Sequence, residues 1–225
     1  MNSAEINSAN RRLSDAAPAD VARWADEQFG ESSAATVSLQ NPVLAHLLTE
    51  HAPSIPLVFI DTQYHFKATM DYKRQLEQRL GRVIGVIEPE VPKDDLWRHS
   101  TTACCQVRKV APLQRFLSDR QGWVTGVRAS DTVGRGAAHH VELDPRNHVV
   151  RVNPLLNVSE DEMASYIDRH ELPRHPLTDL GYTSIGCWPC TTAVTLGEDS
   201  RAGRWRGEAK TECGLHYLYE HHSNL

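Results

Sequence analysis

Long apolar runs are missing from this 225-residue chain, and none approaches the ~20 residues that a membrane-spanning helix needs. The N-terminal stretch from Met1 to Asp20 is rich in Ser, Ala and Asn and lacks the apolar core of a signal peptide. These two absences predict a cytoplasmic protein without a membrane partner.

Excess positive charge is also missing, since the formal net charge is −5. A chain of this charge is not expected to coat nucleic acid non-specifically. Its basic residues are nevertheless concentrated around Arg108 and Lys109 and again between Arg201 and Lys210. Each of them alone is most simply a solvated surface residue, but such groups within an acidic chain favour a small anionic ligand.

Cysteines are few, and their number, five, is odd. In a reducing compartment they are not expected to form a disulfide framework. Their arrangement is more informative: Cys104 and Cys105 are adjacent, Cys187 and Cys190 have C-x-x-C spacing, and Cys213 stands alone. The pattern is that of four ligands and one additional thiol.

Apolar strands alternate with amphipathic helices along most of the chain, which predicts an α/β fold with a doubly wound, mainly parallel sheet. The expected strands cover 34–37, 55–60, 83–87 and 123–127, with a strand pair at 141–143 and 149–152, and the expected helices cover 18–29, 69–80 and 159–170, with another starting at 43. We expect a flexible segment over 1–17, one α/β domain over 18–200 and a mobile tail over 201–225.

Two strand ends carry residues suited to ligand binding. Asn41 can cap the helix that follows it, with Pro42 at the first position, and backbone N–H groups at such a start bind anions. Asp61 and Thr62 directly follow a buried strand, and ligands of parallel sheets gather at these carboxyl ends. Without further context, the same residues also serve as ordinary caps and turns.

The adjacent pair Cys104 and Cys105 restricts what the cysteines can hold. Neighbouring side chains on a helix point about 100° apart, so both reach one site only if the site is large or the helix is distorted. Zinc needs ligands at ~2.3 Å from one point, whereas an iron–sulfur cubane is broader. Structural zinc and a redox-active Cys187-x-x-Cys190 pair remain alternatives at this point.

Four segments together resemble the assimilatory adenosine 5′-phosphosulfate (APS) reductases. They are Cys-Cys-Gln-Val-Arg-Lys-Val-Ala-Pro-Leu at 104–113, Gly-Tyr-Thr-Ser-Ile-Gly-Cys-Trp-Pro-Cys-Thr at 181–191, Arg-Ala-Gly-Arg-Trp at 201–205 and Glu-Cys-Gly-Leu-His at 212–216. The resemblance runs in order from about residue 18 to 219.

The resemblance implies an adenine-nucleotide α-hydrolase type of fold, a [4Fe–4S] cluster and a cysteine nucleophile. The implied cluster ligands are Cys104, Cys105, Cys187 and Cys190. Cys213 would be the nucleophile, with His216 close in sequence and Lys109 between cluster and substrate.

Substrate-binding residues are also implied, with Arg201 and Arg204 meeting the phosphate and sulfate groups. The full set is Ser38, Asn41, Ile60, Asp61, Thr62, Arg108, Gly126, Arg135, Arg201 and Arg204. Two departures concern the nucleotide pocket: the loop 38–42 lacks the paired glycines of the parent pyrophosphatases, and Gln63 stands where a glycine is usual.

The implied reaction is attack of the Cys213 thiolate on the sulfur of APS, which releases AMP and leaves S-sulfocysteine. Thioredoxin would then release sulfite by thiol exchange. A reductase for the 3′-phosphorylated donor (PAPS), or for both donors, is the close alternative. A tRNA thiolation enzyme, which should keep a Ser-Gly-Gly-x-Asp-Ser loop, and a zinc-stabilised binding module are distant ones, and a homo-oligomer stays open.

Overall fold

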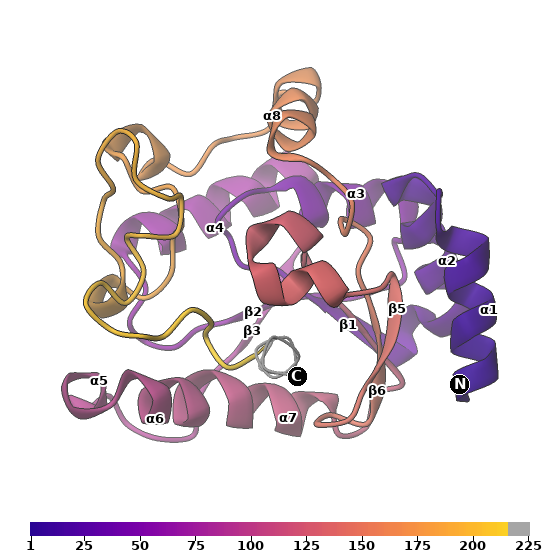
Figure 1. The fold of residues 1–225 in the computed structure, drawn as a ribbon, viewed down its shortest axis with the longest axis horizontal. Helices are drawn as coiled ribbons and strands as arrows, with labels where there is room; N and C mark the ends of the chain where they lie inside the picture. The colour runs from indigo at the N-terminus through magenta and orange to yellow at the C-terminus, as the bar shows by residue number, and fades with distance from the viewer. Residues whose placement is uncertain (216–225) are drawn as a thin grey trace.

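A six-stranded sheet forms the centre of the protein in a computed structural model that describes residues 1–215 (Figure 1). The strands are β1 (Ser33–Thr36), β2 (Leu57–Ile60), β3 (Ile84–Ile87), β4 (Gly122–Val124), β5 (Val141–Asp144) and β6 (Val149–Val152). Their order is β3-β2-β1-β4-β6-β5, and all neighbours are parallel except the β5–β6 pair. The predicted α/β class with a mainly parallel sheet is confirmed.

Helices flank the sheet on both sides. They are α1 (Ser3–Leu13), α2 (Pro18–Phe29), α3 (Val43–His51), α4 (Lys67–Leu80), α5 (Leu96–His99), α6 (Thr101–Cys105), α7 (Ala111–Leu117) and α8 (Glu160–Arg169). Local signals set several of their ends: α4 stops at Gly81, whose φ of 61° is left-handed, and α8 begins with the expected capping box of Ser159 and Glu162. None of the helices within residues 1–215 is long and apolar enough to cross a membrane.

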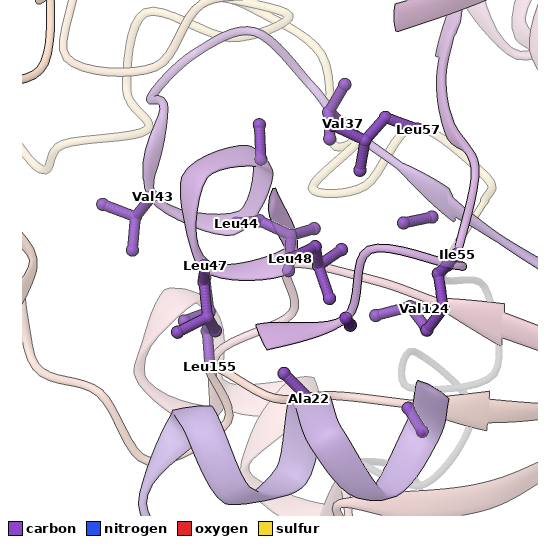
Figure 2. Packing of buried hydrophobic residues seen from close by; sticks show 14 of the residues in the cluster. Ala22, Val37, Val43, Leu44, Leu47, Leu48, Ile55, Leu57, Val124 and Leu155 are labelled. Carbon is purple, nitrogen blue, oxygen red and sulfur yellow. The ribbon is translucent and has the colours of Figure 1, made fainter. Parts of the chain in front are cut away.

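Alternate residues of β1, β2, β3, β4 and β6 enter two different cores. Ala35 and Leu57 belong to the larger core, which α2 and α3 cover; Figure 2 shows Leu44, Leu47 and Leu48 of α3 within this core. Ala34 and Val58 point to the opposite face, where Leu113 of α7 packs. The period of two thus buries both faces of these strands. Because β1, β2, β3, β4 and β6 are parallel, their carboxyl ends lie at one edge of the sheet.

The N-terminal segment differs from the sequence prediction. A flexible segment is expected over 1–17, whereas the structure has α1 there, started by a capping box of Asn2 and Glu5. Its Leu13 is buried, and the Asn10 amide exchanges two hydrogen bonds of 2.8 and 2.9 Å with the backbone of Val141. The polar composition of this stretch concealed a helix that a distant strand stabilises.

The β5–β6 hairpin contains a buried ion-pair network. Arg151 of β6 is 2% exposed and lies 2.9 Å from Asp144 and 2.8 Å from Glu142, both in β5. Since the three charges are largely removed from water, they depend on one another for compensation.

Candidate active site

The loop after β1 is tied together by its own side chains. Ser38 accepts a hydrogen bond from the backbone of Gln40 at 3.4 Å, and Asn41 accepts one from Val43 at 3.3 Å at the start of α3. The Gln40 amide donates to the carbonyl of Thr183 at 3.2 Å. The loop at the carboxyl end of β1 is therefore joined to the segment that carries the C-x-x-C pair.

The helix that carries Cys104 and Cys105 is distorted directly after these two residues, as a shared site for both side chains would require. Helix α6 ends at Cys105, and residues 106–110 continue as a π-helical turn before α7. Such wide turns change the direction in which neighbouring side chains point and are frequent at functional sites. Cys104 and Cys105 are both buried there, so one of the two conditions for a shared site is met.

All four cysteines of the predicted ligand set line one small cavity, together with Thr62 and Lys109 among others. The Thr62 hydroxyl lies 3.1 Å from the Cys187 sulfur. Burial, followed by the neighbouring thiols, raises the pKa of Cys104 and of Cys190 to about 11 each. As free thiols these two side chains are neutral at pH 7.

The cavity is not arranged for one small ion. Within residues 1–215, no three His, Cys, Asp or Glu side chains converge closely enough to hold a single metal ion. A zinc site needs its sulfurs about 2.3 Å from one point, whereas a cluster distributes four thiolates over a broader group. The donor set that lines the cavity is four thiols, the donor type that holds an iron–sulfur cluster.

Lys109 interacts electrostatically both with cysteines of this cavity and with the lone Cys213. Burial by itself lowers the pKa of Lys109, but the nearby sulfurs of Cys187, Cys213 and Cys105 outweigh it, and the pKa lies above its ordinary value. The ammonium is thus charged in a partly desolvated position, where its field is weakly screened.

A cleft of about 1020 Å³ adjoins the cysteine cavity, and Cys105 lines both. The cleft is lined by the cations Arg146, Arg201, Arg204 and Lys210 and by the acids Asp131, Asp199, Glu208 and Glu212. It also receives Gly214, the residue after Cys213. The last described segment of the chain therefore runs along a cleft of mixed charge.

Arg204 is a cation of the cleft for which the described residues provide no acidic partner. Its guanidinium stacks on the Trp205 ring, 4.4 Å from the centroid. It also donates a long hydrogen bond of 3.4 Å to the Ser184 hydroxyl. Its Nε is buried without a hydrogen-bond partner within residues 1–215. Such a donor is well suited to an anion that enters the cleft.

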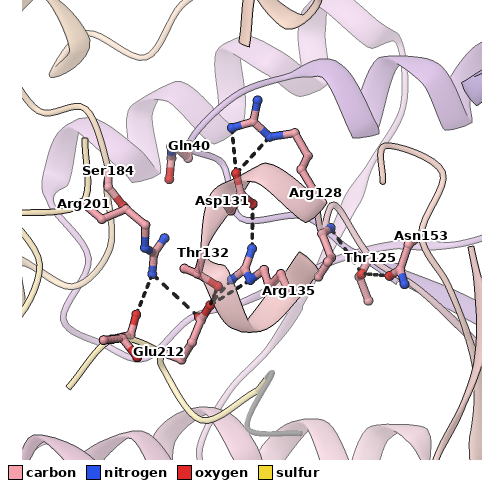
Figure 3. Close-up of polar contacts among 12 residues, drawn as sticks. Gln40, Thr125, Arg128, Asp131, Thr132, Arg135, Asn153, Ser184, Arg201 and Glu212 are labelled. Atoms are coloured by element: carbon pink, nitrogen blue, oxygen red, sulfur yellow. Dashed lines mark hydrogen bonds and ion pairs between the residues drawn. The ribbon is translucent and has the colours of Figure 1, made fainter. Parts of the chain in front are cut away.

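The other two arginines predicted to bind anions contact the chain's own tail. Arg135 forms two hydrogen bonds with Glu212, at 2.7 and 2.9 Å, and Arg201 donates to the carbonyl of Thr211 at 3.0 Å (Figure 3). Burial and the repulsion of Arg135 and Arg204 lower the pKa of Arg201, despite the opposing effect of Glu212.

Arg108 is one of the predicted substrate-binding residues that do not line the cleft. It is fully buried, donates to Gln63 at 2.7 Å and to the carbonyl of Pro92 at 2.6 Å, and contacts the Tyr64 ring. Gln63 has a left-handed φ of 67°, which explains why a glycine suits this position.

The remaining predicted residues lie at the carboxyl ends of the strands or beyond the described chain. Ile60 is buried at the end of β2, and Asp61 accepts a hydrogen bond from the Gln63 backbone at 2.7 Å. Gly126 packs against Leu44, which a Cβ at that position would meet at 3.6 Å. His216 lies outside the described residues.

Three residues that sequence reasoning did not select are prominent at the site. Lys210 lies 3.3 Å from the Cys105 sulfur, and Arg146 donates to the carbonyl of Gly214 at 2.5 Å. Glu212 fills the space between Arg135 and Arg201. The sequence could have indicated Lys210 and Glu212, because both lie within three positions of the lone Cys213. Arg146 lies in an ordinary turn, and nothing in the sequence around it indicates a role at the site.

Comparisons with known proteins agree with this geometry. The family model described as "Phosphoadenosine phosphosulfate reductase domain" matches residues 33–193. Proteins named "Adenosine 5′-phosphosulfate reductase" from Streptomyces coelicolor and Rhodococcus opacus are 36% and 37% identical to this chain; the matches cover 92% of both chains in the first case, and 91% of this chain and 90% of the relative in the second.

A solved structure is also similar. The crystal structure of phosphoadenylyl-sulfate (PAPS) reductase from Candida auris, in a phosphate complex, superposes with a TM-score of 0.75 at 27% identity. The superposition covers 85% of this chain and 98% of the fungal chain.

Proposed function

The chain belongs to the phosphoadenosine phosphosulfate reductase family, and from this premise we propose that it reduces adenosine 5′-phosphosulfate to sulfite in sulfate assimilation. The observation that carries the proposal is the position of the segment around Cys213. It runs along a cleft that also contains Arg204, a cation without an acidic partner among residues 1–215. A thiol whose two neighbours, Glu212 and Gly214, line the same cleft as an anion receptor suits attack on a sulfate group.

In the proposed first step, the Cys213 thiolate attacks the sulfur of APS. A sulfur–sulfur bond forms, the bond between sulfur and the bridging oxygen breaks, and AMP leaves with that electron pair. Lys109 and Arg201 are both electrostatic neighbours of Cys213. Their charge attracts the anionic substrate and compensates the negative charge that collects on the leaving phosphate.

The second step needs a dithiol reductant of the thioredoxin class. One of its thiolates attacks the Cys213 sulfur and releases sulfite, and its second thiol resolves the mixed disulfide. The two electrons thus come from the dithiol, which leaves as a disulfide. All five cysteines are unpaired in the structure, which supports a reducing compartment such as the cytoplasm.

Cys104, Cys105, Cys187 and Cys190 would hold a [4Fe–4S] cluster, for which the four thiols around one cavity are the supporting observation. Such a group, when bound, supplies an electrostatic field near the sulfate position. In this proposal Lys109, a charged neighbour of Cys105, Cys187 and Cys213, binds the substrate's sulfate oxygens. Iron and sulfide in a ratio of one to one would support the cluster, and zinc alone would contradict it.

Reduction of the 3′-phosphorylated donor is the second candidate. It is supported by the similarity to the Candida auris structure, which is that of a phosphoadenylyl-sulfate (PAPS) reductase. The relatives named for the unphosphorylated donor are more similar in sequence, 36% and 37% against 27% identical, and they favour APS.

The test uses anaerobically purified protein incubated with APS or with PAPS in the absence of any thiol. Intact mass and peptide mapping then locate any added sulfonate, with Cys213→Ser as the matched control. An adduct on Cys213 from APS alone supports the proposal, and adducts from both donors indicate dual specificity. The absence of any adduct, with iron and sulfide present, contradicts the reductase function.

A further inference from the structure

The residue before the proposed nucleophile is a buried carboxylate. Glu212 is 3% exposed, and its two oxygens accept hydrogen bonds from Nε and Nη2 of Arg135 at 2.7 and 2.9 Å. The Thr132 hydroxyl adds a third contact at 3.3 Å. Figure 3 shows this carboxylate facing Arg135 from the C-terminal segment. A two-pronged pair of this kind fixes orientation as well as distance.

Arg135 is anchored from behind by a second acid. Its Nη1 donates to Asp131 at 2.6 Å, and Asp131 is in turn held by Arg128 at 2.7 Å. Nε, Nη1 and Nη2 of Arg135 are therefore all bonded to carboxylates. Arg204, in contrast, has no carboxylate partner within residues 1–215. Arg135 and Arg204, both predicted to bind the anionic substrate, are thus in different electrostatic situations.

The segment around Cys213 is also held at its two ends. On one side, Lys210 contacts the Cys105 sulfur at 3.3 Å and lies 5.1 Å from the centroid of the Trp205 ring. On the other side, the carbonyl of Gly214 accepts a hydrogen bond from Arg146 at 2.5 Å. The contact of Glu212 is the most buried of the three, and Glu212 directly precedes Cys213.

We propose that Glu212 and Arg135 form a latch that positions Cys213 in the cleft. In this proposal Arg135 holds the segment that carries the nucleophile, and Arg204 and Arg201 bind the substrate anion. Both members of the latch are positioning residues, because they act on the reaction through Cys213. The inference rests on the proposed function, in which the Cys213 thiol attacks the substrate.

The physical basis is the cost of separating the pair. When one partner leaves, the other remains as a buried charge without compensation, which is strongly unfavourable. The docked segment is therefore the favoured state, and Cys213 is held ready for the substrate. Opening the latch frees the same thiol, with its sulfonate, for the reductant.

The experiment compares the wild-type holoenzyme with Glu212→Gln, which keeps the shape of the side chain and removes its charge. The matched control is Glu198→Gln, which removes another Glu–Arg pair, that with Arg206 at 2.9 Å, outside the cleft lining. The first readout is the rate of Cys213 alkylation by iodoacetamide without substrate, followed by peptide mapping. We expect Glu212→Gln to raise this rate about tenfold and the control to leave it unchanged.

The second readout separates positioning from substrate binding. Adduct formation from APS should slow about tenfold in Glu212→Gln. The dissociation constant for APS, measured in a Cys213→Ser background, should not change. The charge-swapped variant Arg135→Glu with Glu212→Arg should recover slow alkylation and part of the adduct rate.

Two results would overturn the latch. One is an alkylation rate that does not respond to Glu212→Gln. The other is tighter APS binding in Glu212→Gln, which would mean that the carboxylate competes with the substrate for Arg135. Failure of the proposed function would look different, because wild-type protein would then form no adduct while alkylation of Cys213 still responded to the latch.

Discussion

Gly186, the residue before Cys187, leaves the space that Arg204 occupies. A Cβ at position 186 would lie 2.4 Å from Nη2 and 2.6 Å from Cζ of Arg204, which is closer than real contacts allow. The guanidinium has little room to yield toward Trp205, because it already stacks on that ring at 4.4 Å. We predict that Gly186→Ala displaces the guanidinium from the cleft while the fold stays intact.

The size of the effect follows from the bond that is lost. A hydrogen bond from a charged donor contributes about 1.5–3 kcal/mol, which corresponds to roughly a 10- to 150-fold lower kcat/KM for APS. The matched control is Gly85→Ala in β3, where a Cβ would meet Val58 at an ordinary 3.5 Å. We expect the control to keep its kcat/KM.

A double-mutant cycle decides whether the effect passes through Arg204. In an Arg204→Ala background the clash is gone, so adding Gly186→Ala should reduce kcat/KM no further. If Gly186→Ala reduces activity equally in both backgrounds, the argument is refuted. The substitution would then act through its neighbour Cys187.

Three further predictions concern stability and are measured by denaturant unfolding. Burial lowers the pKa of His175 to about 4, while the unfolded chain titrates near 6.5, so the free energy of unfolding should fall by roughly 3 kcal/mol as the pH drops from 6.5 to 4. His175→Gln should make this fall smaller, since protonation no longer breaks the bond from Leu177 to the ring at 3.2 Å; an unchanged pH profile would contradict this. Gln63→Gly relieves the backbone strain of a φ of 67°, about 1 kcal/mol, but removes the 2.7 Å hydrogen bond from Arg108. Because a hydrogen bond from a charged donor contributes more than this strain costs, we expect the free energy of unfolding to fall. Arg151→Ala should lower the free energy of unfolding by about 3–5 kcal/mol, because Glu142 and Asp144 of β5 lose their buried partner. A loss under ~1 kcal/mol would show that these two ion pairs contribute little.

Local signals carried much of the fold. The helix expected at 18–29 has those bounds, and the capping box of Ser159 and Glu162 begins α8 as expected. These features depend on residues a few positions apart, so the sequence contains them directly. Helix α1 was missed because part of its stabilisation comes from Val141, 131 positions from Asn10.

The cysteine motifs and the lone Cys213 could likewise be read from the sequence, and through them the family. From the sequence, a distorted helix could only be named as one condition under which Cys104 and Cys105 reach the same site. The π-helical turn at 106–110 meets it, and such a turn has no simple sequence pattern.

The tertiary structure alone decided which charges meet. Glu212 and Arg135 are 77 positions apart, and nothing near either residue selects the other from among many acids and arginines. The path of the C-terminal segment over the sheet brings them together and removes them from water. Desolvation gives an ion pair its strength, and desolvation is a property of the folded chain.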